Sequence, residues 1–251
     1  ECIICTKVPP SLQPEREGER GTPATFTQAY LTERLDASLH RLQTDYVDLY
    51  LLHSPDGVAS WEEVCQAMDH LRTSGKIRYW GLSNHDAGMV QSCIRTAEAL
   101  GVSGPTVLEE YYTIAGYALT DSGRSRVRKL EEELFPVMRS HHLGLMAFSP
   151  MDAGHLSATN SPDSGSALAD LHDSLDQAAG DLNVGRAQVC AAWVMAHQEV
   201  STILAGPEQP KHVDELLAGI SLELPDEILQ TLDDASMTYS RNIEEKAHKK
   251  S

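Results

Sequence analysis

The chain has 251 residues, of which 20 are basic and 37 acidic, so its formal net charge is −17. This acidity excludes broad binding to nucleic-acid phosphates or to an anionic membrane surface, because like charges repel. The sequence contains no apolar run near the roughly 20 residues of a membrane-spanning helix, and a length of about 250 residues suits one (β/α) barrel domain.

Six short apolar runs predict β-strands along the whole chain. Their hydrophobic residues are continuous rather than alternating, which is typical of parallel strands buried on both faces. We expect strands at Cys2–Val8, Val47–His53, Ile77–Ser83, Pro105–Glu109, Gly144–Ser149 and Ser201–Ala205. The first strand follows Glu1 directly, so we expect that a preceding part of the domain is missing.

Amphipathic stretches between these runs predict helices. Ser60 and Glu63 form a capping-box pattern, and Asp86 is an N-cap candidate. Helices are expected at Thr25–Leu42, from Ser60 to Gly75, from Asp86 to Gly101, and at Ser125–His141, Ala167–Leu182, Arg186–His197, Lys211–Gly219 and Pro225–Ala235. Pro9–Ala24 and Ser157–Gly165 are predicted to be surface loops or lids, and the charged segment from about residue 241 a flexible tail.

The alternation of strands and helices predicts an α/β fold with a parallel sheet, either doubly wound or closed into a barrel. A doubly wound nucleotide-binding fold has a glycine-rich turn after its first strand, whereas Pro9 and Pro10 follow here. We therefore predict a TIM-barrel type of fold in a single domain over residues 1–251.

Five cysteines are scattered among apolar neighbours and show no spacing typical of disulfide frameworks or zinc sites. We expect five buried thiols, no metal site and a cytoplasmic protein.

The predicted strands end in polar side chains, at the edge where (β/α) barrels carry their chemistry. These residues are Lys7, His53, Ser83, Asn84, Glu109 and Ser149. Taken singly, Lys7 has an ordinary explanation as a solvated side chain and His53 as a core histidine. Because they finish consecutive strands, we expect them to form one functional site.

Three long segments of the sequence resemble the aldo-keto reductases, in the family's order. They are Leu35–Leu42 followed by Asp45–Pro55, then Gly75–Asn84, then Met146–Met151, and the resemblance extends from Lys7 to about Ser236. The resemblance implies reduction of a small-molecule aldehyde or ketone to an alcohol, with NADP(H) or NAD(H) as the cofactor.

The resemblance also assigns roles by position. Lys7 and His53 match the family's catalytic lysine and histidine, which suits an alkoxide that forms on hydride attack and needs a proton donor and a positive environment. Cofactor-binding roles fall to Ser83, Asn84 and Glu109 at the nicotinamide carboxamide, Phe148 stacking on the ring, Ser149, Pro150 and Met151 near the pyrophosphate, and Lys211 and Glu215 at the adenosine end.

Several residues depart from the family pattern. Glu109 replaces a glutamine, and a carboxylate accepts but does not donate hydrogen bonds unless it is protonated. Glu208 and His212 stand where the family binds the 2′-phosphate, and Leu216 replaces an asparagine. We expect weak cofactor binding without a strong preference for NADP(H), unless Lys211, or Arg16 and Arg20 from the first loop, offset the acidic charge.

The family's catalytic tyrosine and aspartate lie upstream of the lysine, and none of the eight tyrosines present falls in the family's motif. We therefore expect a (β/α)8 barrel that lacks its first two strand–helix units, with impaired activity of this chain alone. The exposed sheet edges at Ile3-Ile4 and Ile203-Leu204 are expected to favour oligomer formation.

Two other functions stay open. The chain is alternatively a non-catalytic binding or regulatory module, as potassium-channel β-subunits partly are; upstream Asp and Tyr residues separated by four positions would favour the enzyme. The third possible function is an enzyme that forms a Schiff base with Lys7. His53 and the Ser83-Asn84 pair argue against it. The sequence does not define which carbonyl compound is the substrate.

Overall fold

The structure is a computed structural model that describes residues 2–10, 26–57, 59–120, 123–126 and 130–248. The chain divides into two compact units. The first unit consists of Glu1–Glu109 and Val137–Gly144, and the second unit of Glu110–Pro136 and Leu145–Ser251.

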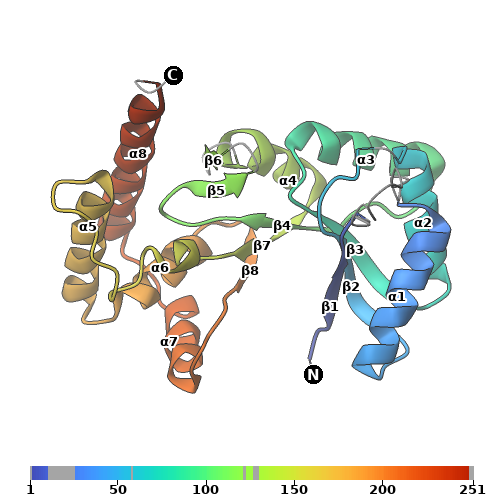
Figure 1. Cartoon of the computed structure of the whole chain (residues 1–251), viewed down its shortest axis with the longest axis horizontal. Coiled ribbons are helices and arrows are strands. Elements are labelled where there is room, and N and C mark those ends of the chain that lie inside the picture. The colour runs from blue at the N-terminus through green and yellow to red at the C-terminus, as the bar shows by residue number, and fades with distance from the viewer. Residues whose placement is uncertain (1, 11–25, 58, 121–122, 127–129, 249–251) are drawn as a thin grey trace, which may run out of the picture. The chain divides into compact units, whose positions relative to one another are not determined.

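Six strands form one sheet in the order β1-β2-β3-β4-β7-β8 (Figure 1). Their bounds are Cys5–Val8 (β1), Val47–Leu52 (β2), Ile77–Ser83 (β3), Val107–Tyr111 (β4), Gly144–Phe148 (β7) and Val200–Leu204 (β8). The pairings β1–β2, β2–β3, β3–β4 and β7–β8 are parallel. The predicted parallel sheet and its six strands in chain order are confirmed.

The first strand is shorter and more exposed than expected. It begins at Cys5 instead of Cys2, and the side chain of Ile3 is 72% exposed. Among the described strands β1 pairs with β2 alone, and its register starts where Cys5 faces Leu49. Residues ahead of this register lack a covering strand in the described part of the sheet, so the predicted burial of Cys2 and Ile3 is wrong.

The helices follow most of the sequence signals. Their bounds are Gln28–Leu42 (α1), Trp61–Thr73 (α2), Ala87–Leu100 (α3), Phe135–His141 (α4), Ala167–Leu182 (α5), Arg186–Met195 (α6), Pro210–Ile220 (α7) and Asp226–His248 (α8). Ser60 and Glu63 make the predicted capping box at α2, and the Asp86 carboxylate accepts from the Met89 backbone N–H at the start of α3. Local sequence alone therefore specifies these two starts.

The helix predicted over Ser125–His141 is wrong in its first part. Tyr117–Thr120 (β5) and Gly123–Arg126 (β6) form an antiparallel hairpin instead. A π-helical turn over Leu130–Leu134 then precedes α4. Pro136 lacks the N–H that an α-helix would bond to the fourth residue back, and a π turn accommodates this break.

The last helix is longer than predicted. Helix α8 continues past Ala235 to His248, and it lies beside α5 (Figure 1). Its buried side chains include Leu232, Ser236, Tyr239 and Ser240, so the buried stripe extends past residue 235 at helical spacing. The segment 241–248 is helical, and the flexibility of the tail stays a prediction.

The core of the first unit forms where apolar strand residues meet helix stripes. Leu51 and Leu52 of β2 and Leu31 and Leu35 of α1 are fully buried. Strands β3 and β4 approach closely at Gly81, where an added Cβ would lie 2.1 Å from the Val107 carbonyl oxygen. Only glycine fits at this position.

The cysteines are more varied than expected. Cys65, Cys93 and Cys190 are buried, Cys5 is half-buried and Cys2 is exposed. The prediction of five buried thiols is therefore wrong for Cys2. Among the described residues, no helix has the length and apolar character required to cross a membrane.

Candidate active site and dinucleotide pocket

The register of the first four strands brings the predicted residues of the first unit to one edge of the sheet. Ser83 pairs with Glu109 across β3 and β4, and Lys7 pairs with Leu51 next to the end of β2. The His53 backbone N–H donates to Val8 O at 2.9 Å. Lys7, His53, Ser83, Asn84 and Glu109 therefore share the carboxyl edge of the sheet, where parallel α/β folds bind ligands.

An ion pair joins the two ends of this edge. The Lys7 Nζ donates to Glu109 Oε1, and Glu109 is 3% exposed while the Lys7 side chain is 32% exposed. Burial, with a smaller contribution from the negative charge of Glu109, raises the pKa of the neighbouring Cys5 thiol to about 11, and Lys7 opposes this rise. Glu109 thus acts as the counter-ion of Lys7.

Asn84 fastens the end of β3 to the end of β2. Its backbone has a φ of +61°, in the left-handed region that asparagine tolerates better than most residues. Its side-chain amide donates to the His53 carbonyl oxygen at 2.8 Å and to Ser83 Oγ at 3.0 Å. Ser83 is fully buried, whereas His53 is exposed and accessible to a small molecule.

The second unit contains a cavity of about 600 Å³ beside the ends of β7 and β8. This volume lies in the range of small-molecule sites. The cavity is lined by Ser149, Pro150, Met151, Ala153, Gly154, Ser157, Thr159, Ala187, Ala205, Gly206, Pro207, Glu208, His212, Glu215 and Leu216.

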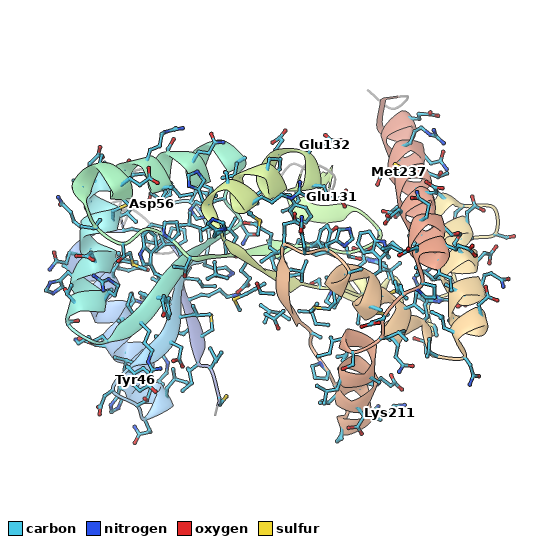
Figure 2. The ribbon with its side chains drawn as sticks, turned by 180° about the vertical axis from the view of Figure 1, so that it is seen from behind. Tyr46, Asp56, Glu131, Glu132, Lys211 and Met237 are labelled. Atoms are coloured by element: carbon cyan, nitrogen blue, oxygen red, sulfur yellow. The ribbon has the colours of Figure 1, made fainter. Side chains whose placement is uncertain are left out.

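Four of the six cofactor residues predicted in this unit line the cavity, and two do not. Ser149, Pro150, Met151 and Glu215 are lining residues. Lys211 is exposed on the first turn of α7 and is not a lining residue (Figure 2). The Phe148 ring instead forms a T-shaped pair with the Tyr111 ring, with centroids 5.3 Å apart.

The cavity lining carries acidic side chains and, among the residues that form it, neither lysine nor arginine. The carboxylates are those of Glu208 and Glu215, and His212 lines the cavity with them. Carboxylates accept hydrogen bonds from ribose hydroxyls but repel a further phosphate, which requires charge-assisted donors. The lining therefore offers acceptors for the hydroxyl groups of a sugar.

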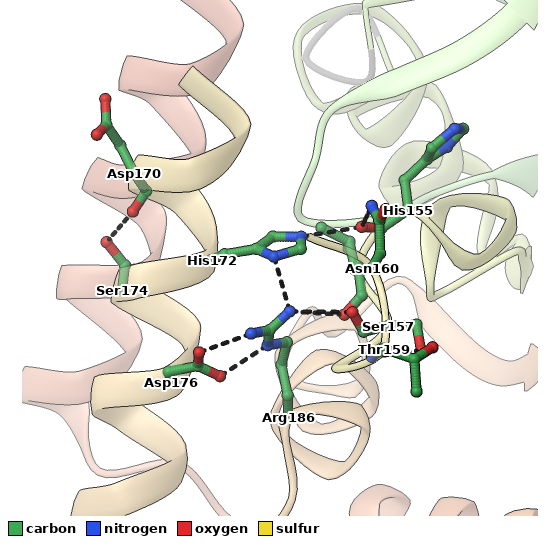
Figure 3. Close-up of polar contacts among 10 residues, drawn as sticks. His155, Ser157, Thr159, Asn160, Asp170, His172, Ser174, Asp176 and Arg186 are labelled. Atoms are coloured by element: carbon green, nitrogen blue, oxygen red, sulfur yellow. Dashed lines mark hydrogen bonds and ion pairs between the residues drawn. The ribbon is translucent and has the colours of Figure 1, made fainter. Parts of the chain in front are cut away.

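Sequence reasoning missed a polar cluster behind this cavity. Arg186 at the start of α6 contacts His172 and Asp176 on α5 (Figure 3). The position of Arg186 is a sequence signal for this cluster. A basic residue in the first turn of a helix is unfavourable next to the positive end of the helix dipole, so it needs a compensating acidic partner. Tyr111 and Asp152 form a second buried contact, in which the phenol donates to the carboxylate.

Comparison with known proteins identifies the family. The sequence model of the Aldo/keto reductase family matches residues 1–236. The chain is 34% identical over 206 residues to a methylglyoxal reductase of Escherichia coli, covering 80% of this chain and 62% of the relative. It is 28% identical over 207 residues to norsolorinic acid reductase of Aspergillus flavus, covering 79% and 50%. The chain thus spans about half the length of the latter relative.

Two further similarities concern the alternative function as a regulatory module and the fold. A probable voltage-gated potassium channel subunit beta of Arabidopsis thaliana is 26% identical over 217 residues, covering 78% of this chain and 63% of the relative. The crystal structure of a thermostable aldo-keto reductase in complex with the inhibitor epalrestat matches 93% of this chain and 71% of its own, with a TM-score of 0.72 and 25% identity. The expected (β/α)8 type of fold is confirmed by this match. The chain belongs to the aldo/keto reductase family.

Proposed function

We propose that this chain provides the cofactor site and part of the catalytic group of an NAD(P)(H)-dependent reductase acting on a small aldehyde or ketone. The observation that carries the proposal is the meeting of Lys7, His53 and Asn84 at the carboxyl edge of the first unit's strands. Family membership and the reductase names of relatives support it.

The proposed catalytic roles follow from the charge that develops on the substrate oxygen. A bound dihydronicotinamide would supply a hydride to the carbonyl carbon, and the alkoxide formed would take a proton from water to give the alcohol. The Lys7 ammonium stabilises this negative charge, and the exposed His53 imidazole orients the carbonyl oxygen by a hydrogen bond. The ion pair with Glu109 holds Lys7 in position.

The proposed cofactor contacts follow the chain order. In the first unit, Ser83, Asn84 and Glu109 are assigned to the carboxamide. In the second unit, Phe148 is assigned to the nicotinamide ring, and Ser149, Pro150 and Met151 to the pyrophosphate. Glu215, with Glu208, accepts from the ribose hydroxyls of the adenosine. The exposed position of Lys211 supports a role limited to charge compensation.

A second function is favoured by the Lys7–Glu109 pair. The carboxylate offsets the charge of the only lysine assigned a catalytic role, which would weaken stabilisation of an alkoxide. Together with the similarity to a potassium channel subunit beta, this supports a module that binds the cofactor without rapid turnover.

Cofactor binding and turnover distinguish these functions. The 251-residue chain is titrated with NADH and with NADPH by nicotinamide fluorescence, and methylglyoxal is supplied as a test substrate. We expect weak binding of both cofactors and turnover below about 1 s⁻¹. The variants Lys7→Met and His53→Ala should abolish residual turnover while binding persists, and Lys76→Met serves as a surface control. Binding with no turnover under any condition would favour the regulatory module.

Cofactor preference is tested at Glu208. Glu208→Arg removes a carboxylate and adds a donor for the 2′-phosphate, so we expect about a tenfold gain in NADPH affinity, near 1.4 kcal/mol, with little change for NADH. Glu208→Gln separates loss of the carboxylate from gain of the guanidinium. Tight binding of NADPH alone by the unmodified chain, abolished by Lys211→Ala, would contradict the assignment and make Lys211 the phosphate anchor.

A further inference from the structure

The loop between β7 and α5 forms one wall of the cavity and is held from behind by side chains. Ala153, Gly154, Ser157 and Thr159 of this loop line the cavity. On its other side, three consecutive carbonyl groups of residues 155–157 accept hydrogen bonds from α5 and α6 (Figure 3). The shape of this wall therefore depends on the donors of those two helices.

Arg186 supplies most of these donors. Its side chain is 8% exposed, and its Nε and Nη2 donate to the two carboxylate oxygens of Asp176 at 2.8 and 2.6 Å. Its Nη1 donates to the Ser157 carbonyl oxygen at 3.1 Å and to that of Leu156 at 3.5 Å. Such a two-pronged ion pair fixes the plane of the guanidinium, which aims Nη1 at the loop.

The same Nη1 also faces His172 Nδ1 at 2.8 Å. Because a guanidinium only donates, Nδ1 must hold a lone pair, so the imidazole is neutral and carries its proton on Nε2. That Nε2–H donates to the His155 carbonyl oxygen at 2.9 Å. The Asn160 amide donates to the same oxygen at 2.6 Å. One tautomer of one charge state satisfies every contact of the ring.

A proton on Nδ1 would break this arrangement, since two N–H groups and two positive charges would then face each other. Burial and Arg186 from α6 disfavour the charged imidazole, while Asp173 and Asp176 on α5 and the His155 carbonyl oxygen favour it. Burial is the largest of these effects, and the pKa of His172 is lowered from its ordinary value.

We propose that Arg186 is a positioning residue for the cofactor cavity, and that Arg186 and His172 hold the loop of residues 152–160 in its cavity-lining conformation only while His172 is neutral. The ligand class, a nicotinamide dinucleotide, rests on the function proposed above. The adjoining Ala187 lines the same cavity, so a displacement of Arg186 would alter two parts of its wall.

Three variants separate position from charge. Arg186→Lys keeps the positive charge but loses the fork that spans Asp176 and the loop. His172→Asn keeps an acceptor near the place of Nδ1 and does not titrate. Arg95→Lys on α3, where Arg95 donates to Ser92 Oγ on the surface, is the matched control for the arginine change.

Two readouts are measured from pH 8 down to pH 5. Hydrogen exchange of the amides of residues 152–160, corrected for the intrinsic pH dependence, reports how often the loop opens. A fluorescence titration with NADH reports the affinity of the cavity. In the unmodified chain we expect exchange to rise and NADH affinity to fall about tenfold toward low pH. His172→Asn should remove most of this pH dependence, and Arg186→Lys should give fast exchange and weak binding at every pH.

The tautomer provides a check that needs no variant. The ¹⁵N shifts of the His172 ring in the unmodified chain should show a proton on Nε2 and a lone pair on Nδ1 at neutral pH. A ring charged at neutral pH, loop exchange unchanged by Arg186→Lys, or the same pH dependence in His172→Asn would each overturn the proposal. Failure of NADH to bind at any pH would instead reject the proposed function, and loop exchange would still decide the role of Arg186.

Discussion

Glu109 lies in the middle of β4 with almost no exposed surface, and Lys7 is its ion-pair partner. Burying a carboxylate costs free energy unless a positive group and hydrogen bonds compensate it. Lys7 therefore has a structural role, compensating the buried carboxylate, besides its proposed catalytic role. The two roles can be separated, because the structural role affects stability, which is measured without cofactor or substrate.

Removing Lys7 should cost more stability than removing a lysine from a surface ion pair. We expect Lys7→Met to lower the free energy of unfolding by about 2 kcal/mol, since it leaves Glu109 buried and uncompensated, with a discount for the one-third exposure of Lys7. Adding Glu109→Gln should restore part of this loss. Urea denaturation measures the free energy of unfolding of each variant. Lys76→Met, which breaks the surface pair with Asp36, is the control and should lose about 1 kcal/mol or less. Equal losses for both lysines would contradict the expectation.

His85 makes the stability of the first unit depend on pH. Burial lowers its pKa to about 4, while its hydrogen bond to the Ser83 carbonyl and the charges of Asp86 and Asp56 oppose the shift. The unfolded chain binds this proton at the ordinary pKa near 6.5. Stability therefore rises with pH between about 4 and 6.5, is fully present above 6.5 and is lost as the pH falls toward 4.

His85→Gln tests this pH dependence. The variant should flatten the rise in the free energy of unfolding between pH 4 and 6.5, which amounts to about 3 kcal/mol from this one group. Denaturant unfolding at half-unit pH steps gives the slope. A slope identical to that of the unmodified chain would assign the pH dependence to other groups.

At the scale of elements, helix packing explains one glycine that helix propensity disfavours. Gly219 lies in α7, and an added Cβ there would stand 2.9 Å from Gln188 Cα and 3.0 Å from Ala191 Cβ of α6. The close approach of α6 and α7 thus requires the absence of a side chain. The same two helices supply the cavity-lining residues Ala187 and Glu215.

Gly219→Ala should destabilise the second unit by about 1–3 kcal/mol, because overpacking forces the two helices apart. Gly180→Ala in α5 is the matched control, since nothing lies within 4 Å of its added Cβ. That control should gain about 0.5–1 kcal/mol from helix propensity. Thermal unfolding measures both. A stabilising Gly219→Ala would show that α6 and α7 readjust freely.

At the scale of the whole molecule, the outer strands of the described sheet are β1 and β8. Each pairs with one neighbour there, so each presents backbone donors and acceptors on its other side. Ile3 is exposed beside β1, and Ile203 of β8 is half-buried. The large negative charge opposes association between copies at low salt.

We expect the 251-residue chain to self-associate as its concentration rises, and more so at high salt, where the charge is screened. Ile3→Lys and Ile203→Lys place charges at the two edges and should weaken association. Met237→Lys on the exposed surface of α8 is the control (Figure 2). Sedimentation velocity measures the effect, and a single species at every concentration and salt would contradict it.

Local sequence was sufficient for much of the fold because its signals act over a few residues. Continuous apolar runs specified the parallel strands, and Ser60 and Asp86 specified helix starts by capping neighbouring backbone N–H groups. Long motifs specified the family. Within the first unit, Lys7, Ser83 and Glu109 lie toward one edge of the sheet because parallel strands align their carboxyl ends, and the placement of Ser149 at the same edge stays a prediction.

Tertiary structure decided what depends on partners far apart in the chain. The pairing of Lys7 with Glu109 spans 102 positions, and no pattern within β1 or β4 encodes it. The cluster of Arg186, His172 and Asp176 needs two helices in a particular orientation, and the exposure of Lys211 needs the direction of α7. Sequence determines which groups are available, whereas packing determines which of them lie within hydrogen-bond reach.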